Sequence, residues 1–266
     1  MSAFTLSGKT VWLTGASSGI GEALAVALSA AGCRLLLTAR SVDKLAAVRA
    51  RCTEPQRHQL VPMDLSAVDD IAARAAAVLA EYGPVDILIN NAGIGQRASV
   101  LETSLAVERQ ILTLNYLAVA ELTRAVLPQL LQRPQAMVVS VASVMGKFAT
   151  PRRSAYCASK HAVVAFMDAL RAELHGSPVQ VLTVCPGYIN TPFSLAALKG
   201  DGTPQGHMDP GQLRGMAPAR CAEAIVKAMQ KQQAELWIGG KEIFGVYLKQ
   251  LCPPLLRQLV SRVRVT

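Results

Sequence analysis

The sequence predicts an α/β protein with one doubly wound domain: a seven-stranded, mostly parallel sheet with helices on both faces. Short apolar runs alternate with stretches of helical period almost to the C-terminus, and this alternation is typical of parallel strands joined by right-handed crossovers. Runs such as VWLT, RLLLT and DILI are apolar at nearly every position, as expected of strands that helices cover on both faces. The 266 residues are 51% hydrophobic and 17% charged, which suits one large core and excludes a disordered chain.

Each element is justified by its pattern. Seven short apolar runs have the length of strands, at residues 10–14, 34–38, 58–62, 86–89, 136–141, 179–184 and 235–238. Six stretches between them have helical period, at 19–31, 42–51, 67–82, 105–131, 155–174 and 219–230. No break in composition and no repeat separates them, so residues 1–240 are predicted to form a single domain.

Residues 193–218 interrupt this rhythm with a segment rich in glycine and proline. The segment follows a strand that ends at Pro186 and Gly187, and ligands of open α/β sheets bind beyond the carboxyl ends of strands. We therefore expect a substrate lid, with a disordered loop as the alternative. Its apolar residues either line an apolar pocket or pack the lid onto the body: Phe193, Leu195, Leu198, Met208, Leu213 and Met216.

Charge and cysteine content narrow the class of protein. The net charge of +9 admits a nucleic-acid partner, but the basic residues are mostly dispersed, so no nucleic acid is expected. The six cysteines are scattered without a CxxC pair, which indicates free thiols in a reducing compartment and no metal site. Because no signal peptide and no apolar run of membrane-spanning length is visible, a cytoplasmic protein is expected.

A glycine-rich turn joins the first predicted strand to the first predicted helix. Glycines there allow a tight turn and close approach of a pyrophosphate, whose charge the helix N-terminus favours. A strand–helix turn without a ligand is the alternative, but the α/β context favours a dinucleotide. The candidate residues are Gly15, Ser17, Ser18, Gly19, Ile20 and Gly21.

The end of the second strand bears on the choice of dinucleotide. An acidic residue at this place accepts hydrogen bonds from a ribose and repels a 2′-phosphate. Neutral residues stand here instead, followed by Arg40, whose planar guanidinium suits a phosphate. We therefore expect NADP(H) rather than NAD(H); a solvated surface arginine is the alternative.

Three polar residues near the middle of the chain form a spaced set. Tyr156 and Lys160 are four residues apart in a helical stretch, so their side chains share one face. Ser143 follows the strand AMVVSV and is expected beside the nucleotide crevice. A nearby ammonium favours the tyrosine phenolate, and a serine hydroxyl stabilises a developing alkoxide. Taken singly, the three could be a helix cap, a surface tyrosine and a solvated charge.

Together these motifs resemble the short-chain dehydrogenase/reductase family, whose members have a Rossmann fold. The resemblance covers residues 10–191 and rests on TGASSGIG at 14–21, Asp64-Leu65, NNAG at 90–93, Asn115, Ser143, YCASK at 156–160, and Pro186-Gly187 followed by Thr191.

The resemblance implies a role for each matching residue. Tyr156 would be the general acid in reduction and the base in oxidation, Lys160 would lower its pKa and hold the nicotinamide ribose, and Ser143 would bind the substrate oxygen. Asn115 would hold a water of a proton relay. The resemblance also implies that Asp64 approaches the adenine, Asn91 its ribose, and Ile189 and Thr191 the nicotinamide amide. The other cofactor contacts implied are Leu65, Gly93 and Tyr156.

The predicted function is hydride transfer between NADP(H) and a carbonyl or secondary alcohol, and an apolar small-molecule substrate is expected. The alternative is a non-catalytic nucleotide-sensing or nucleic-acid-binding protein on the same fold, which only the basic charge supports. His161, next to Lys160, points in another direction on a helix and is expected to be a structural or surface residue.

Residues 241–266 form a predicted basic, amphipathic extension. Two apolar segments flank Pro253 and Pro254, and they carry Lys241, Lys249, Arg257, Arg262 and Arg264. Such a stripe needs a surface to cover it. We expect it to pack against the body or a second subunit, giving a homo-oligomer, with peripheral membrane contact as the runner-up.

Overall fold

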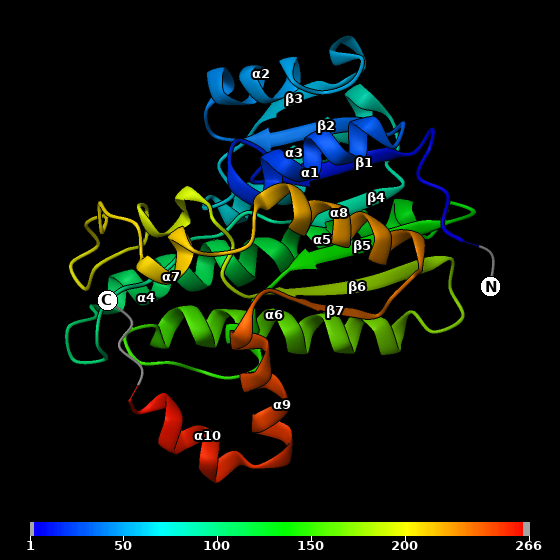
Figure 1. The fold of residues 1–266 in the computed structure, drawn as a ribbon. Coiled ribbons are helices and arrows are strands. Elements are labelled where there is room, and N and C mark those ends of the chain that lie inside the picture. The colour runs from blue at the N-terminus through cyan, green and yellow to red at the C-terminus, as the bar shows by residue number, and fades with distance from the viewer. Residues whose placement is uncertain (1–2, 263–266) are drawn as a thin grey trace.

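The computed structural model describes residues 3–262 and contains the predicted sheet. Its seven strands run in the order β3-β2-β1-β4-β5-β6-β7, and every neighbouring pair is parallel, where the sequence predicted a mostly parallel sheet (Figure 1). The strands are β1 (Thr10–Thr14), β2 (Arg34–Ala39), β3 (Gln59–Pro62), β4 (Ile87–Asn90), β5 (Ala136–Val141), β6 (Val179–Pro186) and β7 (Glu235–Ile238). Strands β2 and β3 are added on one side of β1, and β4 to β7 are added on the other side. The crossover connections therefore diverge between β1 and β4, which opens a crevice at the carboxyl ends of these two strands.

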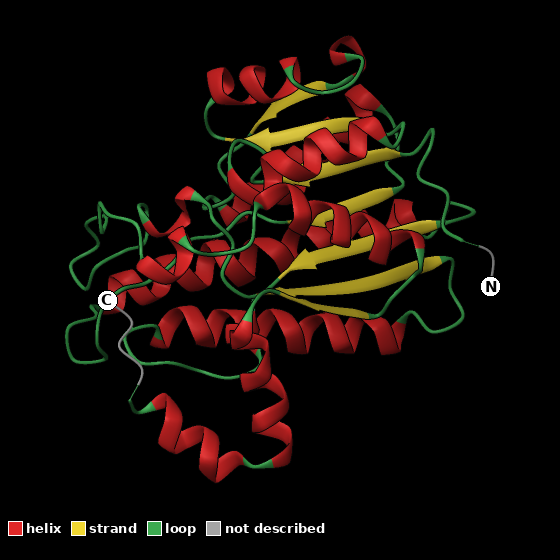
Figure 2. Cartoon of the chain, in the orientation of Figure 1, coloured by secondary structure: helices red, strands yellow, loops and turns green. Residues whose placement is uncertain are grey.

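Two layers of helices cover the sheet (Figure 2). Leu35 and Leu37 of β2 face a core with α1 (Gly19–Ala30) and α8 (Pro218–Gln230), whereas Leu36 faces a core with α3 (Ile71–Tyr82), α5 (Ala118–Leu130) and α6 (Ser154–Glu173). Because successive strand residues enter opposite cores, the strands are apolar throughout. Other helical elements are α2 (Val42–Ala50), α4 (Leu105–Leu112) and the short turns η1 (Pro55–Arg57), η2 (Val68–Asp70) and η4 (Val144–Gly146).

The long helix predicted at 105–131 is interrupted. A π-helical turn, η3 (Thr113–Leu117), lies between α4 and α5 and contains the buried Asn115. π-Helical turns within helices frequently lie at functional sites. Periodicity alone did not reveal this turn, because one extra residue per turn barely alters an apolar pattern.

Residues 193–218 are ordered, so the alternative of a disordered loop was wrong. The segment begins within η5 (Pro192–Ser194) and contains α7 (Pro210–Leu213). Leu198 bridges to Gln96 and Met216 bridges to Ile189, which ties the segment to the body, and a bridge from Leu198 to Pro204 lies within the segment.

The C-terminal extension forms η6 (Lys241–Ile243), α9 (Phe244–Leu251) and α10 (Pro253–Val260). Figure 1 shows α9 and α10 below α6, and the Tyr247 ring of α9 lies edge-on to Trp237 of β7 at 5.1 Å between centroids. The part of the predicted extension beyond residue 262, including Arg264, lies outside the described residues. Within residues 3–262, none of the helices has the length and hydropathy to cross a bilayer.

Candidate active site

The glycine-rich turn after β1 forms a backbone cradle. Gly15 adopts φ +63°, and a Cβ on it would lie 2.8 Å from the Cα of Ala92. A Cβ on Gly21 would lie 2.1 Å from the Gly15 carbonyl oxygen, so no side chain fits there. Ser18 precedes α1 without a side-chain capping bond, which leaves the N–H groups of the first turn to bind a pyrophosphate. These residues fit a dinucleotide.

Neighbouring strand ends complete this cradle. The Asn91 side chain donates to the carbonyl oxygens of Thr14 (3.0 Å) and Gly15 (3.1 Å), which joins the turn to the end of β4. A Cβ on Gly19, where φ is +60°, would lie 3.1 Å from the Thr191 Cβ, so the loop after β6 also reaches the turn. Ile189 of that loop is buried in the core.

Arg40 and Asp64 lie at the adenine end expected for the dinucleotide. Arg40 is exposed directly after β2. The Asp64 carboxylate accepts hydrogen bonds from the Ser66 N–H (2.9 Å) and hydroxyl (2.7 Å), which lower its pKa, and the charge of Arg40 lowers the pKa further. Leu65 is buried in the α3–α5–α6 core, so its side chain serves packing.

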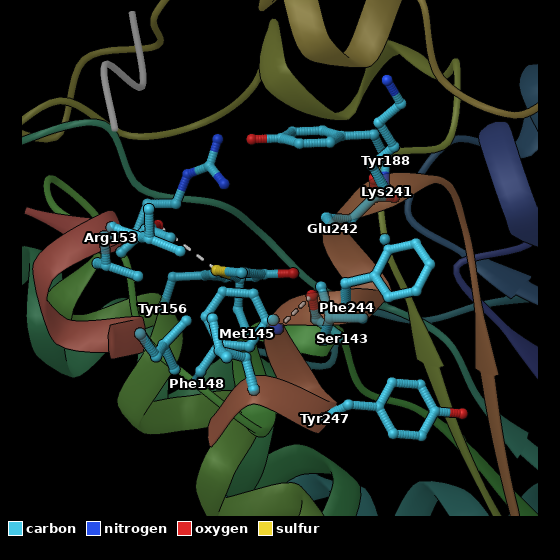
Figure 3. A pocket seen from close by; sticks show the side chains of 18 of the residues that line it. Ser143, Met145, Phe148, Arg153, Tyr156, Tyr188, Lys241, Glu242, Phe244 and Tyr247 are labelled. Carbon is cyan, nitrogen blue, oxygen red and sulfur yellow. Dashed lines mark hydrogen bonds between the residues drawn. The ribbon is translucent and has the colours of Figure 1, made fainter. Parts of the chain in front are cut away.

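Tyr156 and Ser143 lie on one wall of a pocket (Figure 3). Tyr156 lies in the first turn of α6, and its burial raises the pKa of the phenol, while a hydrogen bond with the Ser143 side chain acts in the opposite direction. The Ser143 hydroxyl donates to the Pro186 carbonyl oxygen at 3.3 Å and accepts from the Met145 N–H at 3.1 Å. Both hydroxyls are therefore held at the carboxyl end of β5, as predicted from spacing.

Lys160 lies one turn of α6 after Tyr156 and is buried. Its ammonium donates to the Val141 carbonyl oxygen at 2.9 Å, and burial lowers its pKa to about 8. A Cβ on Gly93 would lie 3.6 Å from the Lys160 Nζ and 3.1 Å from the Asn115 Oδ1, so the three residues are neighbours. Asn115 itself accepts from the Ile94 N–H at 2.8 Å.

His161 takes no part in this cluster, since its Nδ1 lies 2.9 Å from the carbonyl oxygen of Cys157, one turn back on α6. Within residues 3–262, no group of three or more His, Cys, Asp or Glu side chains is placed to hold a metal ion.

The pocket has a volume of about 620 Å³ and a mostly apolar lining. Its reactive wall carries Ser143 and Tyr156, and the polar residues Arg97, Arg153 and Glu242 also line it. The apolar side comes from the η4 region and the extension, through Phe148, Phe244, Leu248, Leu251, Leu256 and Leu259.

Residues 9–200 match the model of the short chain dehydrogenase family. That match spans the glycine cradle, the Asn115 turn and the pair Ser143 and Tyr156. The chain belongs to the short-chain dehydrogenase/reductase family.

Proteins of this family resemble the chain over nearly its whole length. "Dehydrogenase/reductase SDR family protein 7-like" of Anopheles gambiae is 43% identical over 93% of this chain and 80% of its own length. "Dehydrogenase/reductase SDR family member 7" of Homo sapiens is 39% identical over 93% and 75%. A short-chain dehydrogenase structure from Streptomyces avermitilis superposes with a TM-score of 0.81 and 33% identity, covering 96% of this chain and 98% of that one.

Sequence reasoning misplaced the apolar wall of the short-chain dehydrogenase pocket. Of the six apolar residues predicted to line the pocket from residues 193–218, only Phe193 does so, and Gln212 of the same segment also lines it. Leu198 packs instead with Val107 and Ile111, and Leu213 is exposed. The extension supplies the wall, and its apolar stripe was the signal that could have indicated this.

Proposed function

We propose that the protein is an NADP(H)-dependent oxidoreductase that acts on a carbonyl or secondary alcohol of an apolar substrate. The observation that carries the proposal is the pocket itself. The hydroxyls of Tyr156 and Ser143 stand on one wall of an otherwise apolar cavity, beside a backbone cradle that fits a dinucleotide. Apolar pockets with a few convergent polar groups are typical of small-molecule sites.

The bound dinucleotide would supply or accept the hydride. Tyr156 donates its phenolic proton to the substrate oxygen during reduction and takes it back during oxidation. The Ser143 hydroxyl donates a hydrogen bond to the same oxygen as charge develops there. Lys160, one turn along α6, favours the phenolate through its positive charge. Asn115 lies against Gly93 and close to Lys160, where it supports a proton path to solvent.

The preference for NADP(H) is supported by the end of β2. The side chains there are Ala39, Arg40 and Ser41, so no carboxylate repels a 2′-phosphate, and Arg40 is exposed to bind it. Family membership does not decide the matter. One solved relative, from Burkholderia phymatum, is in complex with NAD, and another, from Thermococcus sibiricus, is complexed with 5-hydroxy-NADP.

A panel of ketones, aldehydes and secondary alcohols tests the proposed function. Purified protein is mixed with each compound and with NADPH, NADH or their oxidised forms, and absorbance of the reduced nicotinamide is followed. We expect turnover with NADPH and apolar ketones and little with sugars. An absence of turnover across the whole panel, with cofactor bound, would contradict the proposal and favour a nucleotide sensor.

The exposed side of the extension supports a second part of the proposal, a homo-oligomer, for which we propose the cytoplasm as the location. Phe244, Leu251 and Leu259 line the open side of the pocket and are still 72%, 84% and 47% exposed, and Leu255, which does not line the pocket, is 43% exposed. A second copy would cover this surface, and with Lys249 and Arg257 nearby an anionic membrane is the other candidate. Deletion from Pro253 onward should change the oligomeric mass, or else liposome co-sedimentation; if neither changes, the extension serves the pocket alone.

A further inference from the structure

A buried ionic cluster lies at the polar end of the pocket. Arg97 and Arg153, which are 5% and 4% exposed, both line the cavity, and Asp209 of the lid lies behind them at 2%. The Asp209 Oδ2 accepts from Arg97, with Nε at 2.8 Å, and from the Arg153 Nη2 at 3.3 Å. Two guanidinium groups therefore share one carboxylate.

Arg97 and Asp209 neutralise each other's charge and have further hydrogen-bond partners within the fold. Arg97 also donates to the Gln96 carbonyl oxygen at 2.6 Å, and the other carboxylate oxygen of Asp209 accepts from Gln205 at 2.8 Å. Burial acts to raise the pKa of Asp209, but the hydrogen bonds from Arg97 and Gln205 outweigh burial and hold the pKa below its usual value. Asp209 is therefore ionised, and this pair anchors the lid to the body.

Arg153 is the surplus cation of the cluster. Its Nε is buried and has no hydrogen-bond partner, and its guanidinium lies 5.7 Å from the centre of the Tyr188 ring. Figure 3 shows Arg153 and Tyr188 on the rim of the same cavity. A buried guanidinium that shares its carboxylate with a second guanidinium carries a charge that is costly unless a ligand in the cavity neutralises it.

The other charged residues of the pocket do not neutralise this end. Lys241 and Glu242 both line it, and their opposite charges offset each other. The Glu242 carboxylate already accepts hydrogen bonds from the Tyr188 N–H at 2.7 Å and the Gly240 N–H at 2.9 Å. One net positive charge therefore remains, at Arg153, three residues before Tyr156.

We propose that Arg153 binds a carboxylate of the substrate. The substrate is then an amphipathic oxo acid or hydroxy acid whose acid group pairs with Arg153 and whose apolar chain lies along Phe148, Leu256 and Leu259. One carboxylate neutralises one surplus charge, and the guanidinium fork matches its two oxygens, whereas a phosphate monoester brings nearly two charges. This inference rests on the proposed function and names the substrate class for it.

Matched acids and esters test the assignment. Straight-chain oxo acids that differ in the number of methylene groups between ketone and carboxylate are compared with their methyl esters, and kcat/KM is measured for each. We expect the wild type to prefer one acid over its ester by roughly tenfold to a hundredfold, the usual effect of a charge-assisted hydrogen bond. Arg153→Gln should abolish that preference, and circular dichroism and thermal unfolding of the variant show whether it is folded. Arg153→Lys should keep part of the preference.

Arg152→Gln is the matched control, because Arg152 is the adjacent arginine, does not line the pocket and pairs with Glu102 at 3.9 Å. It should leave the preference for the acid unchanged. Equal kcat/KM for acids and esters in the wild type, or a preference that survives Arg153→Gln, would overturn the proposal while leaving the oxidoreductase function intact. An Arg153-dependent preference for an alkyl phosphate over the acid would overturn the choice of carboxylate.

A binding experiment separates this inference from catalysis. Displacement of an environment-sensitive fluorescent probe from the pocket by laurate and by methyl laurate needs no turnover. Tighter binding of laurate in the wild type but not in Arg153→Gln supports the site even if no ketone of the panel is reduced. Equal binding of the two ligands by the wild type contradicts it.

Discussion

The cofactor side and the substrate side of this site are built by different means. The cofactor side is made of backbone: Gly15 and Gly21 lie so close to Ala92 and to each other that no Cβ fits. The substrate side is made of side chains from distant parts of the chain, from Arg97 through Tyr156 to Leu259. A backbone cradle admits one kind of ligand, whereas a wall of side chains changes shape with each substitution. The first therefore determines the reaction class, and the second determines the substrate.

Tyr156 lies where the two sides meet, and its replacement is expected to give the largest effect. Tyr156→Phe removes the proton donor but keeps the ring, so kcat should fall roughly a thousandfold, within the range for general acid catalysis. Cofactor affinity, measured by fluorescence titration, should stay within about twofold because the cradle is unchanged.

Tyr247→Phe is the matched control, since Tyr247 lines the same pocket while Figure 3 shows its hydroxyl directed away from Tyr156. Turnover by Tyr156→Phe close to that of the wild type would remove the tyrosine from the mechanism.

Lys160 connects the cofactor side to protein stability. Its pKa is lowered from 10.5 to about 8 by burial, so below pH 8 the folded state carries the cost of a buried charge, about 3 kcal/mol. Above pH 8 the folded state releases the proton before the unfolded state does, and the cost disappears by about pH 10.5. The stability of the wild type relative to Lys160→Met should therefore rise between pH 8 and 10.5 in cofactor-free protein.

Chemical denaturation at several pH values measures this difference. The lost hydrogen bond to the Val141 carbonyl oxygen adds an offset that does not depend on pH. A difference that stays constant from pH 7 to 10.5 would show that Lys160 titrates normally.

The same contrast explains what could be predicted from sequence. The strands, the glycine turn and the pair Tyr156 and Lys160 depend on local order, where period and spacing carry the information, and the structure places them as expected. The apolar wall depends on where α9 and α10 fold back: the apolar stripe of the extension indicates that something covers it, but not which part of the molecule it faces. The roles assigned to Asn91, Asn115 and Thr191 stay predictions, although the structure brings their segments to one edge of the sheet.

The ionic cluster of the pocket also escaped prediction. Arg97, Arg153 and Asp209 are paired in space, although any two of them are 56 or more residues apart in the sequence. Charged residues at such distances give no periodic signal, and only their burial shows that they act together.

Replacement of Arg40 tests whether a side chain outside the backbone cradle selects NADPH over NADH. Arg40→Ala should weaken NADPH binding roughly tenfold to a hundredfold, the loss of one charge-assisted hydrogen bond, and should leave NADH binding nearly unchanged. Isothermal titration with both cofactors measures this, and Arg49→Ala on α2 serves as a control for a general loss of positive charge. Equal wild-type affinities for the two cofactors would show that Arg40 does not select.

Leu256 provides the corresponding test of the substrate side, with the smallest expected effect. It is 9% exposed, lines the pocket from α10 and packs in one cluster with Phe148 and Tyr156. Leu256→Ala removes apolar surface from that wall, so kcat/KM for an apolar ketone should fall about fivefold, since a partly buried leucine contributes about 1 kcal/mol. Cofactor affinity should not change, because α10 takes no part in the cradle.

Leu255→Ala is the matched control: Leu255 is the neighbouring residue, is 43% exposed and does not line the cavity. Equal losses in the two variants would mean that α10 acts through general stability, and the division between a backbone cofactor side and a side-chain substrate side would not extend to the C-terminal helices.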